Sequence, residues 1–413
     1  MWMAWVAPSN TANPAARARS RSSFPHPLQI DQLESSLEYA LKNARVVTRD
    51  EDFIGSVLVR DGCIASVDRG VSQTGEDLSG DVLMPGIIDI HTDNLEKHFY
   101  PRPNIDWDPV SAAVVHDGGC LSVGVTTVFD SLSLGAYNGS AARGKANLHR
   151  LTEGLAAAER ADMLKAEHRI HWRCETTSDV MHDWLLELSE HPMTSMFSLM
   201  DHTPGQRQYR NIENHLKNWR DNGMNQEAID LRLADCRERQ VRNADINAAL
   251  VAKVAKARNA TLISHDDETP EHVDRAADFG ATVAEFPVTL EAAARAQARG
   301  MTIVMGGPNL MRGGSYSGNV PAAELAKKNL LEAFASDYVP RSLIECAFRL
   351  TAPGFDWPLA KGVATVTATV AEAADLGDRG VIEPGKRADL LRVRVVGDLP
   401  ILRGVWVQGL RVA

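Results

Sequence analysis

The sequence contains few cysteines, and no two of them lie close together. Five are spread over 413 residues, and there is no Cys-x-x-Cys pair that could supply a thiolate metal site. Because disulfides are rare in reducing compartments, this usage favours reduced thiols and a cytoplasmic protein. The cysteines are Cys63, Cys120, Cys174, Cys236 and Cys346.

The sequence also lacks a surplus of positive charge and a long apolar run. It has 44 lysines and arginines against 54 aspartates and glutamates, a formal net charge of −10, which argues against a protein that coats nucleic acid. No apolar stretch approaches the ~18 residues needed to span a bilayer, so we expect no membrane partner. With 44% hydrophobic and 24% charged residues, the chain can form one large domain and a smaller one.

The first 35 residues differ in composition from the rest of the chain. An apolar start with Trp2, Trp5 and Val6 precedes a tract rich in serine, proline and alanine. We expect residues 1–35 to be a disordered extension or to precede the true start of the protein. An export or transit peptide is the alternative, although the apolar part is short and no basic segment precedes it.

Short alternating segments near both ends of the chain predict a small β domain. Between residues 38 and 83 the alternation predicts strands, with Asp61-Gly62 as a hairpin turn. The same pattern returns near the end of the chain, where Gln408-Gly409 is the turn. We therefore expect residues 36–82 and 380–413 to fold together into a β-sandwich.

Residues 83–379 predict an α/β fold, a (β/α)8 barrel of the TIM type. Eight apolar, strand-like runs alternate with helical segments, and eight parallel strands close such a barrel. We expect strands at 83–91, 124–130, 169–175, 194–201, 260–265, 281–286, 301–306 and 333–337. We expect helices at 143–167, 226–258, 289–298, 321–331 and 359–374.

Residues of metal-ligand type stand at the ends of the predicted barrel strands, where parallel α/β barrels build their active sites. His91 and Asp93 lie two residues apart on a strand, so they point the same way and can bind one cation. A histidine and carboxylate set without cysteine suits zinc first, with manganese or iron as alternatives, and it is large enough for two bridged ions. The predicted ligands are His91, Asp93, Glu175, His202, His265 and Asp337.

Each predicted ligand also has an ordinary structural interpretation. A single histidine at a strand end is more often a hydrogen-bonded polar residue, Asp337 could cap the next helix, and Glu175 could pair with Arg173. Their joint placement at the ends of five strands favours the metal site. We assign structural roles to the histidines that fall in helices, in loops or within strands: His116, His149, His168, His171, His182, His191 and His215.

Longer motifs resemble a known family. Pro85-Gly-Ile-Ile-Asp-Ile-His-Thr-Asp93 and Pro384-Gly-Lys-Arg-Ala-Asp-Leu390 resemble the amidohydrolase superfamily, which pairs a metal-dependent barrel with a split β-sandwich. Across residues 38–412 the sequence is more closely similar to the PhnM family of alkylphosphonate breakdown. The motifs that carry this likeness are His91-Thr-Asp-Asn-Leu-Glu-Lys-His98 with Pro101-Arg-Pro103, Arg173-Cys-Glu175, Leu199-Met-Asp-His-Thr-Pro-Gly-Gln-Arg-Gln-Tyr209, Ser264-His-Asp-Asp-Glu-Thr269 and Gly306-Gly-Pro-Asn-Leu-Met-Arg-Gly-Gly-Ser-Tyr-Ser-Gly-Asn319.

The resemblance implies a reaction, namely hydrolysis of the ribosyl triphosphate α-D-ribose 1-methylphosphonate 5-triphosphate to the 5-phosphate and pyrophosphate. The usual His-x-His of the superfamily is here His91-x-Asp93, and Glu175 stands where relatives have a carboxylated lysine. Strand six carries Glu285 instead of a histidine, so His202 is expected to take over that role. A homodimer, or association with other proteins of phosphonate degradation, is a further expectation from the resemblance.

Hydrolysis of a phosphoanhydride needs an activated water and positive charge near the phosphates. A bound cation supplies both, and Asp337 is expected to contact the metal and accept the proton of the water, with His265 beside it in the catalytic centre. Arginine binds phosphate bidentately, whereas lysine acts as a point charge. The expected phosphate contacts are Lys97, His98, Arg102, Arg207, Arg210 and Arg312.

The glycine-rich segment 306–319 is a second candidate for binding phosphate or sugar. Its glycines permit close backbone approach, and the segment follows strand seven, where barrel enzymes often bind phosphate. It lacks the GxxxxGK[ST] pattern of a P-loop, and a flexible connection is the structural alternative. Its hydrogen-bonding side chains are Asn309, Ser315, Ser317 and Asn319.

Two other functions are consistent with parts of the sequence. A barrel of this kind could hydrolyse a C–N bond, as a cyclic amidase or deacetylase does, but the arginines near the strand ends favour a polyphosphate substrate. The chain could also be a non-catalytic subunit of a phosphonate-degrading complex. That role gives no reason for six residues of metal-ligand type at the ends of strands.

Overall fold

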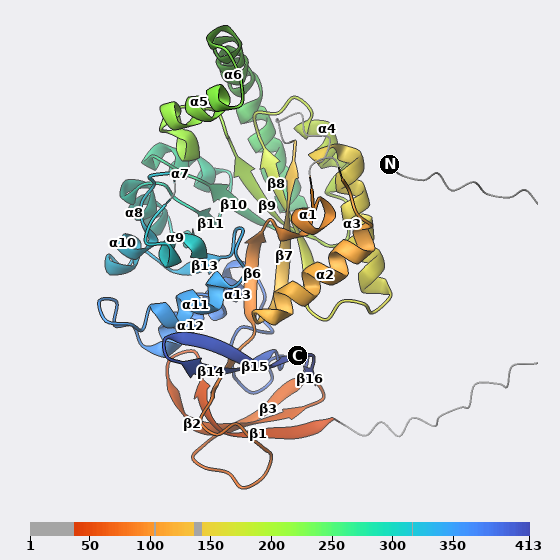
Figure 1. The fold of residues 1–413 in the computed structure, drawn as a ribbon, viewed down its shortest axis with the longest axis vertical. Coiled ribbons are helices and arrows are strands. Elements are labelled where there is room, and N and C mark those ends of the chain that lie inside the picture. Colours follow the sequence, from red (N-terminus) through yellow and green to blue (C-terminus); the bar gives the residue numbers. More distant parts are fainter. Residues whose placement is uncertain (1–36, 103–104, 136–142, 316) are drawn as a thin grey trace, which may run out of the picture. The chain divides into compact units, whose positions relative to one another are not determined.

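The computed structural model describes residues 37–102, 105–135, 143–315 and 317–413. The strands of this part of the chain form two sheets of eight strands each (Figure 1). The expectation for residues 1–35 lies outside these ranges. Residues 37–413 belong to one compact unit, which contains both sheets. We call them the barrel sheet and the end sheet.

The barrel sheet confirms the predicted fold. Its strands are parallel and are hydrogen-bonded in chain order. The first and last strands meet at the rim, where the Asp93 N–H donates to the carbonyl of Asp337 and the Asp337 N–H donates to that of His91, each at 2.9 Å. The strands are β6 (Ile87–Thr92), β7 (Val125–Leu134), β8 (Glu167–Glu175), β9 (Thr194–Met200), β10 (Thr261–His265), β11 (Val283–Glu285), β12 (Thr302–Gly306) and β13 (Ala333–Ala335).

The helices lie between successive strands, and several begin at side-chain caps. Asp108, Thr269 and Thr289 each accept a hydrogen bond from a backbone N–H in the first turn. No helix of the described residues is long and apolar enough to cross a membrane. The helices are α1 (Asn94–Phe99), α2 (Pro109–Ser122), α3 (Lys145–Arg160), α4 (Met181–Leu188), the 3-10 turn η2 (Arg207–Tyr209), α5 (Ile212–Asp221), α6 (Gln226–Ala257), α7 (Pro270–Asp278), α8 (Leu290–Ala298), α9 (Gly307–Met311), α10 (Ala322–Lys327), α11 (Ser342–Arg349), α12 (Leu359–Ala364) and α13 (Ala368–Ala373).

Two predicted elements are each divided in the structure. The helix expected at 359–374 is two short helices, because the backbone leaves helical geometry at Thr367 (φ −134°, ψ −91°). The strand expected at 83–91 is also two, β5 (Val82–Pro85) in the end sheet and β6 in the barrel. Between them, a Cβ added to Gly86 would lie 2.1 Å from the Thr126 hydroxyl oxygen, so only glycine fits where the chain passes from one sheet to the other.

The end sheet is built from both ends of the chain, as predicted. Its order is β16-β15-β14-β5-β1-β2-β3, and β4 pairs with β1. Most pairs are antiparallel, and buried Leu41, Val57, Leu390 and Trp406 share its core. The division into domains at 36–82 with 380–413 and at 83–379 stays a prediction. The strands are β1 (Glu38–Val47), β2 (Asp52–Arg60), β3 (Cys63–Arg69), β4 (Glu76–Asp77), β5, β14 (Leu390–Val396), β15 (Leu399–Val407) and β16 (Leu410–Arg411).

A buried charge network holds α2 against β7 and β8. Asp130 lies between His116 Nε2 and His168 Nδ1, each 2.8 Å away, and Asp117 is 3.3 Å from the other nitrogen of His168. Burial opposes the charge on these groups, but the negative charge of Asp130 raises the pKa of His168 to about 9. Burial raises the pKa of Asp130, but the two histidines lower it to about 2. The network therefore links the helix to the barrel by charge.

We expect Asp130→Asn to lower the free energy of unfolding by about 3–5 kcal/mol, because it removes the buried charge that lies 2.8 Å from His168. His168 holds its proton more tightly when folded, so its contribution is complete below about pH 6.5 and is lost as the pH rises through about 9. Urea unfolding at pH 6 and pH 9 should show this loss in the wild-type chain and much less of it in the variant.

The matched control is Asp106→Asn, which removes the exposed partner of Arg150 and should leave the free energy of unfolding close to that of the wild-type chain, because water screens exposed ion pairs. An Asp130→Asn chain as stable as this control would contradict a stabilising role for the network.

Candidate metal centre

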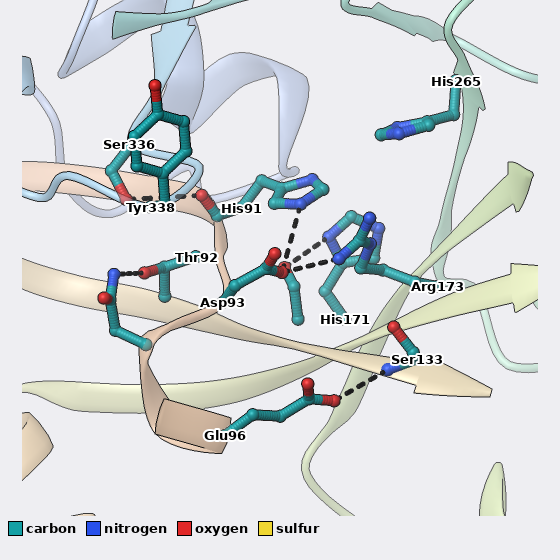
Figure 2. Close-up of polar contacts among 12 residues, drawn as sticks. His91, Thr92, Asp93, Glu96, Ser133, His171, Arg173, His265, Ser336 and Tyr338 are labelled. Atoms are coloured by element: carbon teal, nitrogen blue, oxygen red, sulfur yellow. Dashed lines mark hydrogen bonds and ion pairs between the residues drawn. The ribbon is translucent and has the colours of Figure 1, made fainter. Parts of the chain in front are cut away.

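The six predicted ligands come together at the carboxyl ends of the barrel strands. Asp93, Glu175, His202 and Asp337 line a cavity of about 820 Å³. The other two, His91 and His265, are buried beside them, and Figure 2 shows Asp93 and His91 next to each other at the end of β6. The strand ends thus concentrate nitrogen and carboxylate ligands on one side of the barrel.

One group of ligands gathers at the ends of β8, β9 and β10. Ligand atoms of His202, His265 and Asp266 lie within 4.8 Å of one another, and Glu175 Oε2 is 2.6 Å from His202 Nδ1. The second carboxylate oxygen of Glu175 accepts from the Thr177 hydroxyl at 2.8 Å. Two imidazoles and two carboxylates form a donor set that suits zinc, manganese or iron. We call these four residues, Glu175, His202, His265 and Asp266, position A.

Asp266 was not among the predicted ligands. It follows His265 directly in the sequence, and its Oδ2 lies 3.2 Å from His265 Nε2. Its backbone has a φ of 55°, a conformation that is uncommon for residues other than glycine. The chain therefore turns sharply at the end of β10 and brings a second ligand type next to the histidine. Its place in the Ser264-His-Asp motif was the only available signal.

A second group lies at the ends of β6 and β13. Ligand atoms of His91, Asp93 and Asp337 lie within 4.8 Å of one another, and these three residues form position B. His91 Nε2 is buried without a hydrogen-bond partner among the described residues, and the nearest Asp93 oxygen is 3.7 Å away. A buried nitrogen with nothing to bond is a strong reason to expect a ligand there, so these residues fit a cation.

Arg173 limits the charge available at position B. Its Nη1 donates to Asp93 Oδ1 at 2.6 Å, as Figure 2 shows. Burial by itself would raise the pKa of Asp93, but the Arg173 guanidinium holds that pKa well below its usual range. Burial raises the pKa of Asp337. Position B thus combines a carboxylate that is neutralised by an arginine with a carboxylate that holds protons more readily.

Glu285 orients histidines of both positions and was not predicted to be a site residue. It ends β11, and its side chain is fully buried. One carboxylate oxygen lies 2.8 Å from His91 Nδ1 and the other 2.6 Å from His265 Nδ1, and the two imidazole rings are stacked, with their centroids 5.6 Å apart. Because an ionised carboxylate only accepts hydrogen bonds, both histidines carry a proton on Nδ1 and keep Nε2 for a ligand.

The charge on Glu285 is stabilised by the histidines that it orients. Burial opposes ionisation, but the contacts with His91 and His265 lower the pKa of Glu285 well below its usual value. Sequence patterns gave one hint, the absence of a histidine on the sixth barrel strand. The sequence alone does not show which side chains an acidic residue at the end of a three-residue strand will contact.

The predicted phosphate contacts after the first barrel strand lie apart from the large cavity. Lys97 Nζ donates to Asn94 and to the carbonyl of Tyr338. The His98 ring lies beside His116, and Arg102 forms a backbone bridge with residue 105. None of these three is among the residues that line the cavity. Their roles as phosphate contacts stay predictions.

The other three predicted contacts lie nearer to the centre. Arg207 donates to the His265 carbonyl at 2.9 Å and to Asp267 at 2.6 Å, so it braces the end of β10. Arg210 donates to the carbonyl of Gly318. Arg312 lines a second cavity, of about 110 Å³, beside the glycine-rich segment.

The glycine-rich segment borders the metal ligands through this second cavity. Asp337 and Ser317 line both cavities, and the smaller one also includes Asn309, Ser315 and Asn319. Asn309 is partly used within the segment, because its amide group donates to the Val320 carbonyl and accepts from the Ala322 N–H. The predicted sugar or phosphate role of these side chains is compatible with their position next to Asp337 and stays a prediction.

The large cavity carries cationic side chains that sequence reasoning missed. Arg143 precedes α3, Arg173 lies on β8, and Lys217 and Arg232 lie on α5 and α6. Arg143 also pairs with Glu96 at 2.9 Å. Arg143, Lys217 and Arg232 are distant from the quoted motifs, and Arg173 was considered there only as a partner of Glu175, so only the folded arrangement brings the four to one cavity.

Comparison with known proteins gives one curated relative and several structural neighbours. No family model matches the chain. An alpha-D-ribose 1-methylphosphonate 5-triphosphate diphosphatase of Escherichia coli (strain K12) is 37% identical over 379 residues, covering 90% of this chain and 99% of that protein.

Solved structures share the fold at low sequence identity. N-acetylglucosamine-6-phosphate deacetylase from Pasteurella multocida matches with a TM-score of 0.60 and 13% identity, over 91% of this chain and 100% of that one. A 5-methylcytosine deaminase from Klebsiella pneumoniae matches with a TM-score of 0.60 and 13% identity, over 91% of this chain and 97% of that one. These likenesses show the fold alone.

We expect Glu285→Gln to weaken zinc binding by about 10–100-fold. Glutamine offers one acceptor oxygen in place of two and adds a donor, so one of the two histidines loses its orienting partner. Competition with a chromophoric chelator measures the affinity. Glu291→Gln, at an exposed position on α8, is the control. Equal zinc affinities in the two variants would contradict an orienting role for Glu285.

Proposed function

We propose that this chain, which belongs to the family of alpha-D-ribose 1-methylphosphonate 5-triphosphate diphosphatases, hydrolyses that triphosphate to the 5-phosphate and pyrophosphate. The observation that carries the proposal is the 37% identity over 99% of the relative's length. The cationic side chains along the cavity support it, because a neutral amide would not need them. The chain is accordingly a hydrolase that acts on a phosphoanhydride bond.

We propose that positions A and B each hold a divalent ion, with zinc favoured and manganese or iron as alternatives. Glu175, His202, His265 and Asp266 are the proposed ligands of the first ion, and His91, Asp93 and Asp337 those of the second. When bound, such ions lower the pKa of water towards neutrality and neutralise charge on a phosphoryl oxygen. Glu285 orients one histidine of each position.

The side chains around the metal ligands have separate tasks in hydrolysis. A carboxylate oxygen of Asp337 accepts a proton from the attacking water while the water oxygen bonds to phosphorus and the bond to the pyrophosphate oxygen breaks. Because burial raises the pKa of Asp337, its carboxylate is a stronger base than an exposed aspartate. Arg143 and Arg173 line the cavity and place positive charge where the phosphates lie.

We expect metal-loaded protein to convert the ribosyl triphosphate to the 5-phosphate and pyrophosphate, as followed by phosphorus NMR. Asp337→Asn should lower kcat by at least about 100-fold, because general base catalysis contributes on that order. The control Asp278→Asn, at the exposed end of α7, should keep the wild-type rate.

The two alternative functions predict different outcomes for the same samples. Metal-loaded protein that leaves the triphosphate intact but opens cyclic amides would indicate a C–N hydrolase. Protein that binds metal and acts on neither substrate would indicate a non-catalytic subunit.

We expect position B to bind its ion more weakly than position A, because Arg173 already neutralises Asp93. Stepwise removal with a chelator should release the two ions separately, as counted by elemental analysis. Arg173→Met keeps much of the side-chain length without the charge, and it should increase the affinity of position B for its ion.

Arg169→Met on the same strand is the matched control, since Arg169 pairs with Glu167, which is not a residue of either position. Loss of an ion in Arg173→Met, with both ions kept in Arg169→Met, would contradict competition between Arg173 and a cation.

We also propose that the protein works in the cytoplasm, where its five free cysteines stay reduced. We propose a homodimer, or association with other proteins of phosphonate degradation, as the working assembly. Light scattering of the purified chain and of a mixture with those proteins tests the two assemblies.

A further inference from the structure

The large cavity extends from the metal ligands to a wall formed by α5 and α6. Lys217, His215 and Trp219 of α5 and Arg232 of α6 line it, and the two helices lie together at the top of Figure 1. They belong to the connection between β9 and β10, and βα connections carry the substrate contacts of barrel enzymes. The wall thus faces the same space as Asp93, Glu175 and Asp337.

Packed rings fix the positions of the polar groups on this wall. The centroid of the His215 ring lies 4.3 Å from that of the Tyr209 ring and 4.7 Å from that of the Trp219 ring. The Arg232 guanidinium lies 4.7 Å from the centre of the Trp219 ring, a distance typical of a cation–π contact. A guanidinium held on an aromatic face has lost part of its conformational freedom before a ligand arrives, which favours binding of an anion.

The two cavities that meet at Asp337 differ in charge. The wall of the large cavity carries Lys217 and Arg232, with Asp221 as an acidic neighbour. The smaller cavity beside the glycine-rich segment has one arginine, Arg312, with the acidic residues Asp266 and Asp337 and with serine, asparagine and glycine residues. Substrate that extends to both sides of Asp337 would therefore meet more positive charge on one side than on the other.

The proposed substrate has the same asymmetry about the bond that breaks. On one side is the pyrophosphate leaving group, which carries most of the negative charge. On the other are the ribose hydroxyls and a methylphosphonate, which carries less charge and offers several hydrogen-bonding groups. Charge complementarity matches the first side to lysine and arginine and the second to hydroxyl and amide side chains.

We infer that the wall of Lys217, His215 and Arg232 binds the pyrophosphate group and that the glycine-rich segment with Arg312 binds the ribosyl methylphosphonate end. This inference rests on the proposed function and adds the direction in which the substrate lies. It also predicts that inorganic pyrophosphate binds to the free enzyme at the α5–α6 wall and inhibits it there.

Calorimetric titration of the metal-loaded, full-length protein with inorganic pyrophosphate tests the inference. We expect Lys217→Gln and Arg232→Gln each to weaken pyrophosphate binding by about tenfold or more, because each removes a charge-assisted hydrogen bond. Lys217 is exposed, so its substitution leaves the fold intact. Arg232→Lys keeps the charge and should recover part of the affinity.

Two further variants control for position and for overall charge. Arg237→Gln removes a charge from an exposed position of α6 that does not line the cavity, and it should bind pyrophosphate like the wild-type chain. Arg312→Gln should also leave pyrophosphate binding unchanged while it raises KM for the ribosyl triphosphate.

The outcomes separate this inference from the proposed function. Active enzyme whose Lys217→Gln and Arg232→Gln variants bind pyrophosphate as tightly as the wild-type chain would overturn the inference. Loss of pyrophosphate binding in Arg312→Gln alone would overturn it by assigning that group to the glycine-rich segment. Protein that leaves the triphosphate intact but binds pyrophosphate through Lys217 would refute the proposed reaction and support the wall as an anion site.

Discussion

The site depends on one buried carboxylate that bonds two histidines from distant parts of the chain. Glu285 lies between His91 and His265, which are 174 positions apart in the sequence (265 − 91), and its two oxygens hold the Nδ1 atoms of both rings. The cost of burying this charge is offset by the hydrogen bonds from the two histidines. Because each Nδ1 is held, each Nε2 is available for a ligand. One side chain of β11 thus sets the geometry of both proposed metal positions.

The barrel makes this arrangement possible by turning the backbone sharply where three strands end. Asp266, Phe286 and Asp337 all have φ values between 55° and 57°, a region that residues with a side chain rarely adopt. Such conformations persist where surrounding structure fixes them, and they cluster at functional sites. Here the pairing of β6 with the end of β13 and of β10 with β11 supplies that support. Asp266 and Asp337 therefore lie beside the histidines instead of continuing along their strands.

The sequence was sufficient to predict what depends on short-range pattern. Period-two spacing predicted that His91 and Asp93 lie close together, and they do, although Asp93 follows β6 as the N-cap of α1. Alternation of strands with helices predicted eight barrel strands. Contacts between distant segments could not be predicted in this way. The close approach of Gly86 to Thr126, which divides the expected first strand, depends on how two strands pack.

The same limit applies to charge in the site. Arg173 looked like a partner for its neighbour Glu175, but it pairs with Asp93 at the end of β6, two strands away in the barrel, and that pairing depends on where the strands end relative to one another. Lys217 and Arg232 are unremarkable surface cations in the sequence, and only the packing of α5 against α6 brings them to the cavity. Prediction was strongest for residues that act near their place in the chain and weakest for those that act across the fold.

Anomalous diffraction from crystals of the zinc-loaded protein, recorded at the zinc absorption edge, shows which nitrogen of each histidine binds the metal. We expect zinc within bonding distance of His265 Nε2, a further peak at His91 Nε2, and Glu285 still bonded to both Nδ1 atoms. Zinc bound to Nδ1 of either histidine, or found only at the buried cluster of His116, Asp130 and His168, would contradict this expectation.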